Sequence, residues 1–307
     1  MVSKDEKRWR AAAHIVMIVL SALAILPFIL LIIASFTDED VALKYGYSYF
    51  PQKLSLDAYR YIAENGATFF RAYGMTILVT AIGTASCIVL TALTAYVLSK
   101  SNLPGVKIMN LIIVITMLFN GGLVATYISY VTIFHVKNTI FGLIVPNLLM
   151  NAFNIMLVRN YFSHSIPEEI YESARIDGAS EFVIFFKLVL PLSVPILATV
   201  GLMSGIAYWN DWQNALYYID DKSLYTVQAV LNAINESVAM LASLGGTAGA
   251  SAADLPSTTI RMAVAVVGIF PGAGGISFLP EIFRSRSYGW FCKRMICETQ
   301  VTAQIKG

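Results

Sequence analysis

Long apolar runs, broken by few charged residues, constrain the fold of this chain more than any other sequence feature. A helix that crosses the hydrocarbon core of a bilayer needs about 20 predominantly apolar residues, and several runs reach that length. Of the 307 residues, 57% are hydrophobic and 13% are charged. A water-soluble protein could not hide so much apolar surface, because its exposed area must carry charge. The sequence therefore predicts an all-α polytopic membrane protein.

Six transmembrane helices are predicted from these runs. The third run is interrupted by an Asn-Gly-Gly sequence, the fourth contains one proline, and the fifth contains two. Such residues disturb helix geometry, and membrane proteins tolerate irregular backbone where it faces protein or a water-filled cavity. The predicted spans are residues 11–34, 73–98, 106–134, 139–158, 182–208 and a sixth that begins near 259.

The distribution of Lys and Arg predicts the orientation, because basic residues concentrate on the cytoplasmic side of a polytopic protein. With the N-terminus inside, fourteen of the 21 basic residues face the cytoplasm and seven lie outside. The first run is too long for a signal peptide, so we expect an uncleaved anchor. The segment 159–181 is then cytoplasmic, and the segments 35–72 and 209–258 are extracytoplasmic.

Motifs for catalysis or metal binding are missing from the sequence. The chain has no P-loop, no GxSxG and no HExxH motif. Its three histidines are scattered, and Cys292 and Cys297 form a CxxxxC pair without histidine partners, which is a poor zinc site. We therefore expect no enzyme activity, no metal and no cofactor in this chain. The interiors of the first five predicted spans are also nearly free of the buried ionisable residues that an autonomous channel or carrier would use for coupling. Energy for transport must then come from a partner.

A polar segment, residues 165–181, separates the fourth and fifth runs and has the pattern of a short helix. Ser165 and Glu168 have the spacing of a capping box, and Pro167 lies in the first turn, where its missing N–H is harmless. Gly178 is expected to end the helix. Ala174 lies on a face of small side chains. Two interpretations stay open: this face docks against another protein, or the helix is an amphipathic connector on the lipid.

The residues of this segment resemble the EAA loop of binding-protein-dependent ABC importer permeases. That loop reads roughly E-A-A-x-x-D-G-A and is followed, after a fixed spacer, by L-P-x-x-x-P. The chain departs at Ser173, where alanine is usual and serine is a small substitute. The matching elements are Glu172-Ser173-Ala174, Asp177-Gly178-Ala179, Leu190-Pro191 and Pro195. The resemblance implies that this chain couples to an ATPase subunit through Glu172, Ser173, Ala174, Asp177, Gly178 and Ala179.

Two further stretches are similar to the carbohydrate class of these importers, the maltose type, and to its oligosaccharide-importing subfamily. They are TDEDVALKYGYSYFPQKLSLDAYRYI and YWNDWQNALYYI. The resemblance implies the type I ABC importer permease fold in a bacterial inner membrane. It also implies a second permease subunit as heterodimer partner, an ATPase dimer that binds ATP and Mg²⁺, an extracytoplasmic solute-binding protein and a carbohydrate substrate, but no nucleic acid. A permease for a non-sugar solute is the alternative.

Polar and aromatic residues in or near the spans are the other candidates for function. Asn147, Asn151 and Asn154 recur at spacings of four and three, which places them on one face of a continuous helix. They either join helices by hydrogen bonds or line a sugar pathway. Five aromatic residues follow the fifth span at its predicted outer end: Tyr208, Trp209, Trp212, Tyr217 and Tyr218. They either form an aromatic belt at the membrane interface or, as the resemblance implies, contact the binding protein.

The C-terminal end of the sequence departs from the family pattern. We divide the chain into an anchor and outer segment (1–70), a transmembrane domain (71–271) and an atypical tail (272–307). The resemblance stops at Pro271, before a glycine-rich segment, where related permeases continue with apolar residues into Tyr-Pro-Phe-Phe. A reading frame displaced by one nucleotide from about residue 272 explains this change and predicts a compromised sixth span, or a non-functional copy. The alternative is a divergent tail, and resequencing the gene distinguishes the two.

Overall fold

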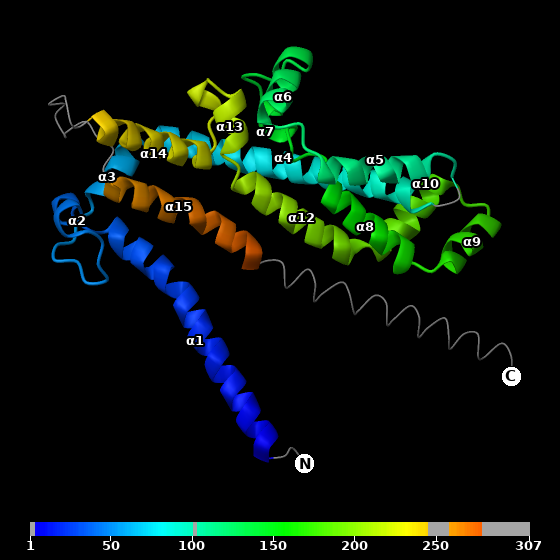
Figure 1. The fold of residues 1–307 in the computed structure, drawn as a ribbon, viewed down its shortest axis with the longest axis horizontal. Coiled ribbons are helices and arrows are strands. Elements are labelled where there is room, and N and C mark those ends of the chain that lie inside the picture. The colour runs from blue at the N-terminus through cyan, green and yellow to red at the C-terminus, as the bar shows by residue number, and fades with distance from the viewer. Residues whose placement is uncertain (1–3, 101–102, 245–257, 278–307) are drawn as a thin grey trace. The chain divides into compact units, whose positions relative to one another are not determined.

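The computed structural model describes residues 4–100, 103–244 and 258–277, and most of these residues are helical (Figure 1). The chain forms two compact units. The first contains the described residues up to Phe70 and those between Val230 and Pro271, and the second contains those from Arg71 to Ala229 and from Gly272 onward.

The first unit holds the N-terminal helix and the segment that follows it. Tyr59 stacks on Phe36 with 4.8 Å between ring centroids, and its hydroxyl lies 2.8 Å from the Ser35 Oγ. Lys53 pairs with Asp38 at 2.7 Å. These contacts fold the segment 36–57 back onto the end of the first helix. The unit contains α1 (Lys4–Ser35), α2 (Glu39–Tyr45), α3 (Asp57–Glu64), the start of α4 (Gly66–Ser99), the end of α14 (Val227–Leu244) and most of α15 (Thr258–Ser277).

The second unit is a bundle in which α4, α8 and α12 share a buried apolar cluster (Figure 1). The segment that contains α9 and α10 lies at one end of this bundle and α13 at the other. Its elements after α4 are α5 (Val106–Leu118), α6 (Leu123–Ile128), the π-helix η1 (Ser129–Ile133), α7 (Ile140–Ile144), α8 (Ala152–His164), α9 (Glu168–Ile176), α10 (Glu181–Ile184), the π-helix η2 (Phe185–Val189), α11 (Leu190–Leu192), α12 (Val194–Trp209), α13 (Gln213–Tyr218), the 3₁₀-helix η3 (Lys222–Leu224) and the start of α14.

Helices occupy all six predicted spans, but only some of these helices are continuous. By length and composition, α1 from Ala12 onward and α4 can cross a membrane. The third and fifth spans are each two apolar pieces, bent by 119° after α5 and by 77° before α12. The interruptions that the sequence predicted, an Asn-Gly-Gly and a pair of prolines, lie at these two bends.

The prediction of one continuous helix over residues 139–158 was wrong. The first piece, α7, ends at Ile144, and α8 begins only at Ala152. Between them Pro146 cannot donate a helical hydrogen bond, and Asn147 adopts a left-handed conformation with φ 61°. Asparagine tolerates this conformation better than most residues do. The fourth span is therefore a short helix, an irregular segment and a second helix.

The sixth predicted span corresponds to α15, which continues through Pro271 and the glycine-rich segment to Ser277. The remainder of the atypical tail, residues 278–307, lies outside the described residues. The displaced reading frame therefore stays a prediction.

Candidate coupling loop and membrane cavity

The polar loop between the fourth and fifth spans contains α9, but this helix does not begin with the capping box that the sequence predicted. The N-cap residue is Pro167, and no side chain caps this end. Ser165 instead ends the preceding helix as its C-cap, and its N–H donates to the Tyr161 carbonyl at 2.8 Å. The capping-box spacing failed as a signal because Ser165 belongs to α8.

The other end of α9 has the geometry that the sequence predicted. Gly178 has φ +77°, a left-handed conformation that L side chains rarely adopt. Its N–H donates to the Arg175 carbonyl at 3.0 Å, and the Ala179 N–H donates to the Ala174 carbonyl at 3.0 Å. This pair of hydrogen bonds is a Schellman motif. Gly178 therefore turns the chain sharply from α9 toward α10.

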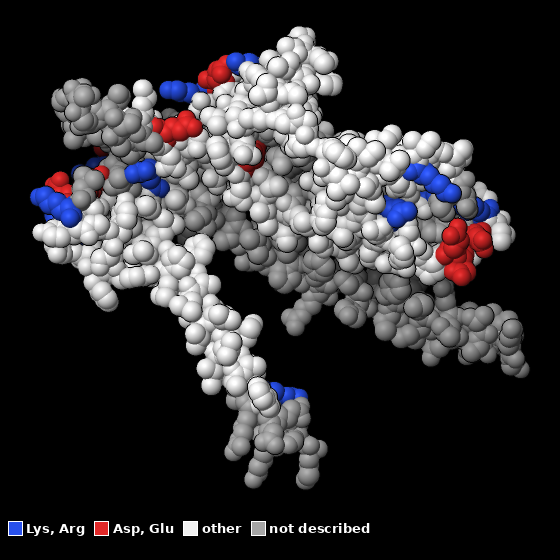
Figure 2. All heavy atoms as spheres, in the orientation of Figure 1, with Lys and Arg blue, Asp and Glu red and all other residues white. Residues whose placement is uncertain are grey.

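The residues of the EAA resemblance divide between two faces of α9. Ala174 is buried, together with Tyr171, in the apolar cluster that joins this loop to the bundle. The loop presents the other face to solvent, and Ile176 on this face is 85% exposed. Acidic side chains gather at this end of the bundle (Figure 2). The exposed members of the predicted set are Glu172, Ser173, Asp177 and Gly178, while Ala179 is half-buried.

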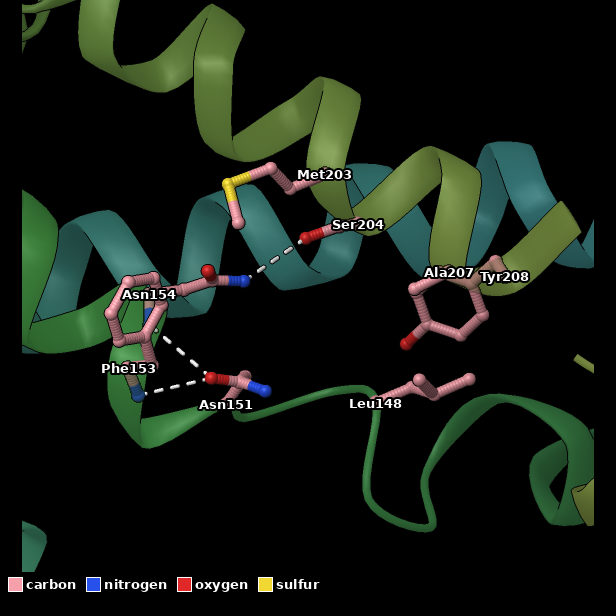
Figure 3. Close-up of a pocket in the computed structure, with 8 residues that line it drawn as sticks. All are labelled: Leu148, Asn151, Phe153, Asn154, Met203, Ser204, Ala207 and Tyr208. Carbon is pink, nitrogen blue, oxygen red and sulfur yellow. Dashed lines mark hydrogen bonds between the residues drawn. The ribbon is translucent and has the colours of Figure 1, made fainter. Parts of the chain in front are cut away.

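A cavity of about 350 Å³ lies between the start of α8 and the C-terminal half of α12 (Figure 3). The Asn151 Oδ1 accepts hydrogen bonds from the N–H groups of Phe153 and Asn154, so it caps α8. The Asn151 amide nitrogen has no hydrogen-bond partner among the described residues. The lining residues are Leu148, Asn151, Phe153, Asn154, Met203, Ser204, Ala207 and Tyr208.

The three asparagines do not share one helical face, because the helix on which that prediction depended is broken. Asn147 is exposed in the irregular segment and does not line the cavity. Asn154 is 7% exposed, and its amide donates to the Ser204 hydroxyl on α12 at 3.4 Å. That hydroxyl also lies 3.3 Å from the Cys87 Sγ on α4. Ser204 thus joins three helices, and the sequence held no signal for this role.

The family is established by comparison with known proteins. Residues 3–270 match the model for the binding-protein-dependent transport system inner membrane component. The chain belongs to this family. Members are membrane components of transport systems, so the permease works in a membrane.

Two curated relatives come from Bacillus subtilis (strain 168). Protein LplC is 35% identical over 264 residues, which cover 85% of this chain and 87% of LplC. The polygalacturonan/rhamnogalacturonan transport system permease protein YtcP is 35% identical over 257 residues, covering 83% of this chain and 87% of YtcP. The permease is thus similar to these proteins over most of both lengths.

A solved structure supports the same fold. A chain of a bacterial ABC transporter involved in the import of the acidic polysaccharide alginate matches the permease with a TM-score of 0.74. The match covers 93% of the permease and 99% of that chain, at 24% sequence identity. The permease therefore has the type I ABC importer fold.

A partly buried carboxylate that the sequence did not single out lies just past the C-terminal end of α12. Burial raises the pKa of Asp211 to about 6. The carboxylate accepts hydrogen bonds from the N–H groups of Gln213 and Asn214 at 3.2 and 3.3 Å, which oppose this rise. Asp211 thus fixes the turn from α12 into α13.

The aromatics predicted at this end do not form one surface. Tyr208 and Tyr218 are each 1% exposed. The Tyr208 hydroxyl donates to the Ile144 carbonyl at 2.9 Å. Trp209 and Tyr217 are half-buried and Trp212 is 38% exposed. The buried pair is therefore part of the packing, while a membrane-interface or binding-protein role stays a prediction for the other three. Among the described residues, no group of three or more His, Cys, Asp and Glu side chains could hold a metal ion.

Proposed function

We propose that this chain is the transmembrane permease subunit of an ABC importer for a carbohydrate, an oligosaccharide rather than a monosaccharide. It forms a heterodimer with a second permease, receives the sugar from an extracytoplasmic binding protein and performs no catalysis itself. ATP and Mg²⁺ bind to a separate ATPase dimer. The similarity to YtcP, a permease named for polygalacturonan and rhamnogalacturonan transport, supports the substrate class.

One observation carries the coupling part of this proposal: the exposed, acidic face of α9, held by the Schellman motif at Gly178. A glycine turn with fixed geometry presents Glu172, Ser173 and Asp177 together at the end of the bundle. Ile176 adds an apolar side chain to the same surface, although the sequence prediction omitted it. This surface suits docking into a cleft of the ATPase. The ATPase is cytoplasmic, so the loop and the N-terminus of the permease lie in the cytoplasm.

The cavity supports a pathway for a hydroxyl-rich solute. Asn151 lines it with an amide donor that has no partner among the described residues, and Phe153 contributes ring surface. Aromatic faces and amide groups are suited to the apolar faces and hydroxyls of a sugar. Asn154 already donates to Ser204 across two helices. We therefore assign a pathway role to Asn151 and a helix-joining role to Asn154.

Reconstitution tests the function directly. The permease, its neighbouring second permease, the ATPase and the binding protein are co-purified and placed in liposomes with ATP inside. We expect uptake of a labelled oligosaccharide that depends on the binding protein and on ATP. Uptake of a non-sugar solute with no oligosaccharide uptake would contradict the substrate class. Uptake without ATP or binding protein would contradict the importer mechanism.

Paired asparagine variants test the two assigned roles. Asn151→Ser keeps a side-chain oxygen that can cap α8 but removes the amide, so we expect a raised KM for uptake and an unchanged thermal stability. Asn154→Leu removes the hydrogen bond to Ser204 and leaves that hydroxyl buried. It should lower the stability of the complex by about 1 kcal/mol, the net contribution of one hydrogen bond, because the buried hydroxyl keeps only the Cys87 thiol as a partner. The reverse pattern would exchange the two roles.

A further inference from the structure

The carboxylate of Glu181 joins three parts of the coupling end of the bundle. Its Oε2 accepts a hydrogen bond from the Tyr96 hydroxyl on α4 at 2.5 Å. Its Oε1 accepts hydrogen bonds from the Nε and Nη2 of Arg175 on α9, both at 3.1 Å. Glu181 itself is the first residue of α10. One side chain thus connects α9, α10 and the end of α4.

A lysine completes this group of side chains. The Lys100 Nζ, just past the end of α4, lies 3.7 Å from the centre of the Tyr171 ring and 4.7 Å from that of Tyr96. It is 3.9 Å from the Glu181 Oε2. A cation over aromatic faces is attracted by their quadrupoles. Because Tyr171 is on α9 and Tyr96 is on α4, the lysine bridges the same two helices as the carboxylate.

The environment keeps the carboxylate charged. The hydrogen bond from Tyr96 holds the pKa of Glu181 below its usual value, and Arg175 and Lys100 act in the same direction. The Lys100 side chain is 15% exposed, and its burial lowers its pKa. Hydrogen bonds to a charged group are stronger than those between neutral groups. The Glu181 and Arg175 side chains are 53% and 44% exposed, so their ion pair alone contributes little. The hydrogen bond from the Tyr96 hydroxyl to the charged carboxylate is part-buried and is the stronger part of the contact.

We propose that Glu181 is a positioning residue that fixes α9 to α4, so that a displacement of α9 by the ATPase moves α4 as well as α12. The turn at Gly178 connects α9 covalently to α10 and, beyond it, to α12. No short covalent connection joins α9 to α4, so side-chain contacts alone must transmit motion between these two helices. This proposal rests on the proposed coupling function of α9 and goes beyond it, because it assigns the route by which motion reaches a second helix.

Two variants and one matched control test the proposal. Tyr96→Phe removes only the hydroxyl that donates to Glu181, and Glu181→Gln removes the charge. Tyr73→Phe is the control, since Tyr73 is on the same helix and its buried hydroxyl has no hydrogen-bond partner in the described chain. In liposomes, the ratio of oligosaccharide imported to ATP hydrolysed should fall roughly five- to tenfold for both variants, a typical range for a lost coupling interaction. The control should keep the wild-type ratio.

A second readout does not depend on the substrate. Cys87 on α4 is buried against Ser204 on α12, so a movement of α4 relative to α12 should change its alkylation rate. In the wild-type complex and in Tyr73→Phe, trapping the ATPase with ATP and vanadate should change this rate, measured by mass spectrometry of the Cys87 peptide. The change should differ in size from the wild-type change in Tyr96→Phe and Glu181→Gln, because α12 then moves without α4.

The outcomes separate this inference from the proposed function. An absence of oligosaccharide uptake by the wild-type complex contradicts the proposed function, and the Cys87 readout then decides the inference. Unchanged Cys87 alkylation on trapping in the wild type, or an equal change in all variants, would overturn the role of Glu181. A loss of ATPase binding in Tyr96→Phe would also overturn it, since the contact would then serve docking and not transmission. A mere loss of folded complex lowers import and hydrolysis together and leaves their ratio unchanged.

Discussion

Two glycines on helices that pack together, Gly83 on α4 and Gly201 on α12, allow a sharp test of the packing. A Cβ atom added at Gly83 would lie 2.6–2.8 Å from three ring carbons of Tyr208. That ring is 1% exposed, and its hydroxyl is held by the Ile144 carbonyl at 2.9 Å. A Cβ atom added at Gly201 would meet the Cδ1 of Ile88 at 2.9 Å and its Cγ1 at 3.7 Å, in a side chain that can rotate. The same substitution therefore meets a fixed ring in one case and a movable methyl in the other.

The expected magnitudes follow from these contacts. Replacing glycine by alanine inside a helix stabilises it by about 0.5–1 kcal/mol, and this gain applies at both sites. Overpacking of a buried site costs about 1–3 kcal/mol, and this cost applies at Gly83, where the ring cannot move without breaking its hydrogen bond. Gly201→Ala should thus be neutral or stabilising. Gly83→Ala should be less stable than Gly201→Ala by about 1–3 kcal/mol.

Thermal unfolding of the detergent-solubilised complex provides the assay. A difference of 1 kcal/mol corresponds to a shift in melting temperature of roughly 2–4 °C for a chain of this size, so the two variants should differ by several degrees. Tyr208→Phe combined with Gly83→Ala frees the ring from Ile144 and should recover part of the loss. Equal melting temperatures for the two alanine variants would refute the close approach of α4 and α12 at Gly83.

Three further predictions concern the loop at Gly178, the topology and the turn after α12. Gly178→Val should reduce transport at least about tenfold, because valine is strained at φ +77°. Gly178→Asn should retain transport, since asparagine tolerates this conformation. Normal transport by the valine variant would exclude the docking role. A cysteine at Asp57 should react with an impermeant reagent in intact cells and one at Glu169 should not; the opposite labelling would reverse the orientation. Burial raises the pKa of Asp211 to about 6, above its value in the unfolded chain. The native state should therefore lose stability as the pH rises from about 4 to 6. At about 1.4 kcal/mol per pKa unit, the loss is at most about 3 kcal/mol. Asp211→Asn should remove this dependence, and a variant that keeps the wild-type pH profile of the melting temperature would contradict it.

Features that depend on a few neighbouring residues were readable from the amino-acid sequence. The apolar runs predicted the long helices because a bilayer-spanning helix is a matter of length and composition. Gly178 predicted the end of α9 because the Schellman turn needs one residue in the left-handed region, and glycine adopts it without strain. The coupling motif could be recognised for the same reason. Its residues lie close together along the chain, so their spacing determines their arrangement.

Tertiary contacts determined the break in the fourth span. A proline can kink a membrane helix or end it, and the outcome depends on whether the freed backbone groups find partners. Here the Ile144 carbonyl accepts from the Tyr208 hydroxyl, and the Pro146 carbonyl accepts from the Asn214 amide at 3.0 Å. Both donors lie more than 60 residues further along the chain. Because of the same break, the three asparagines do not lie on one helical face, and Asn151 and Asn154 have different proposed roles.

The contacts of Glu181 and Ser204 were also determined by the tertiary structure. Tyr96 and Glu181 are 85 residues apart, and Cys87 and Ser204 are 117 apart. Tyrosine, glutamate, cysteine and serine are common residues, and local pattern does not tell which pairs will meet. Their partners are set by how α4, α8, α10 and α12 pack, because a buried polar group must find a donor or acceptor wherever the packed helices bring one within reach.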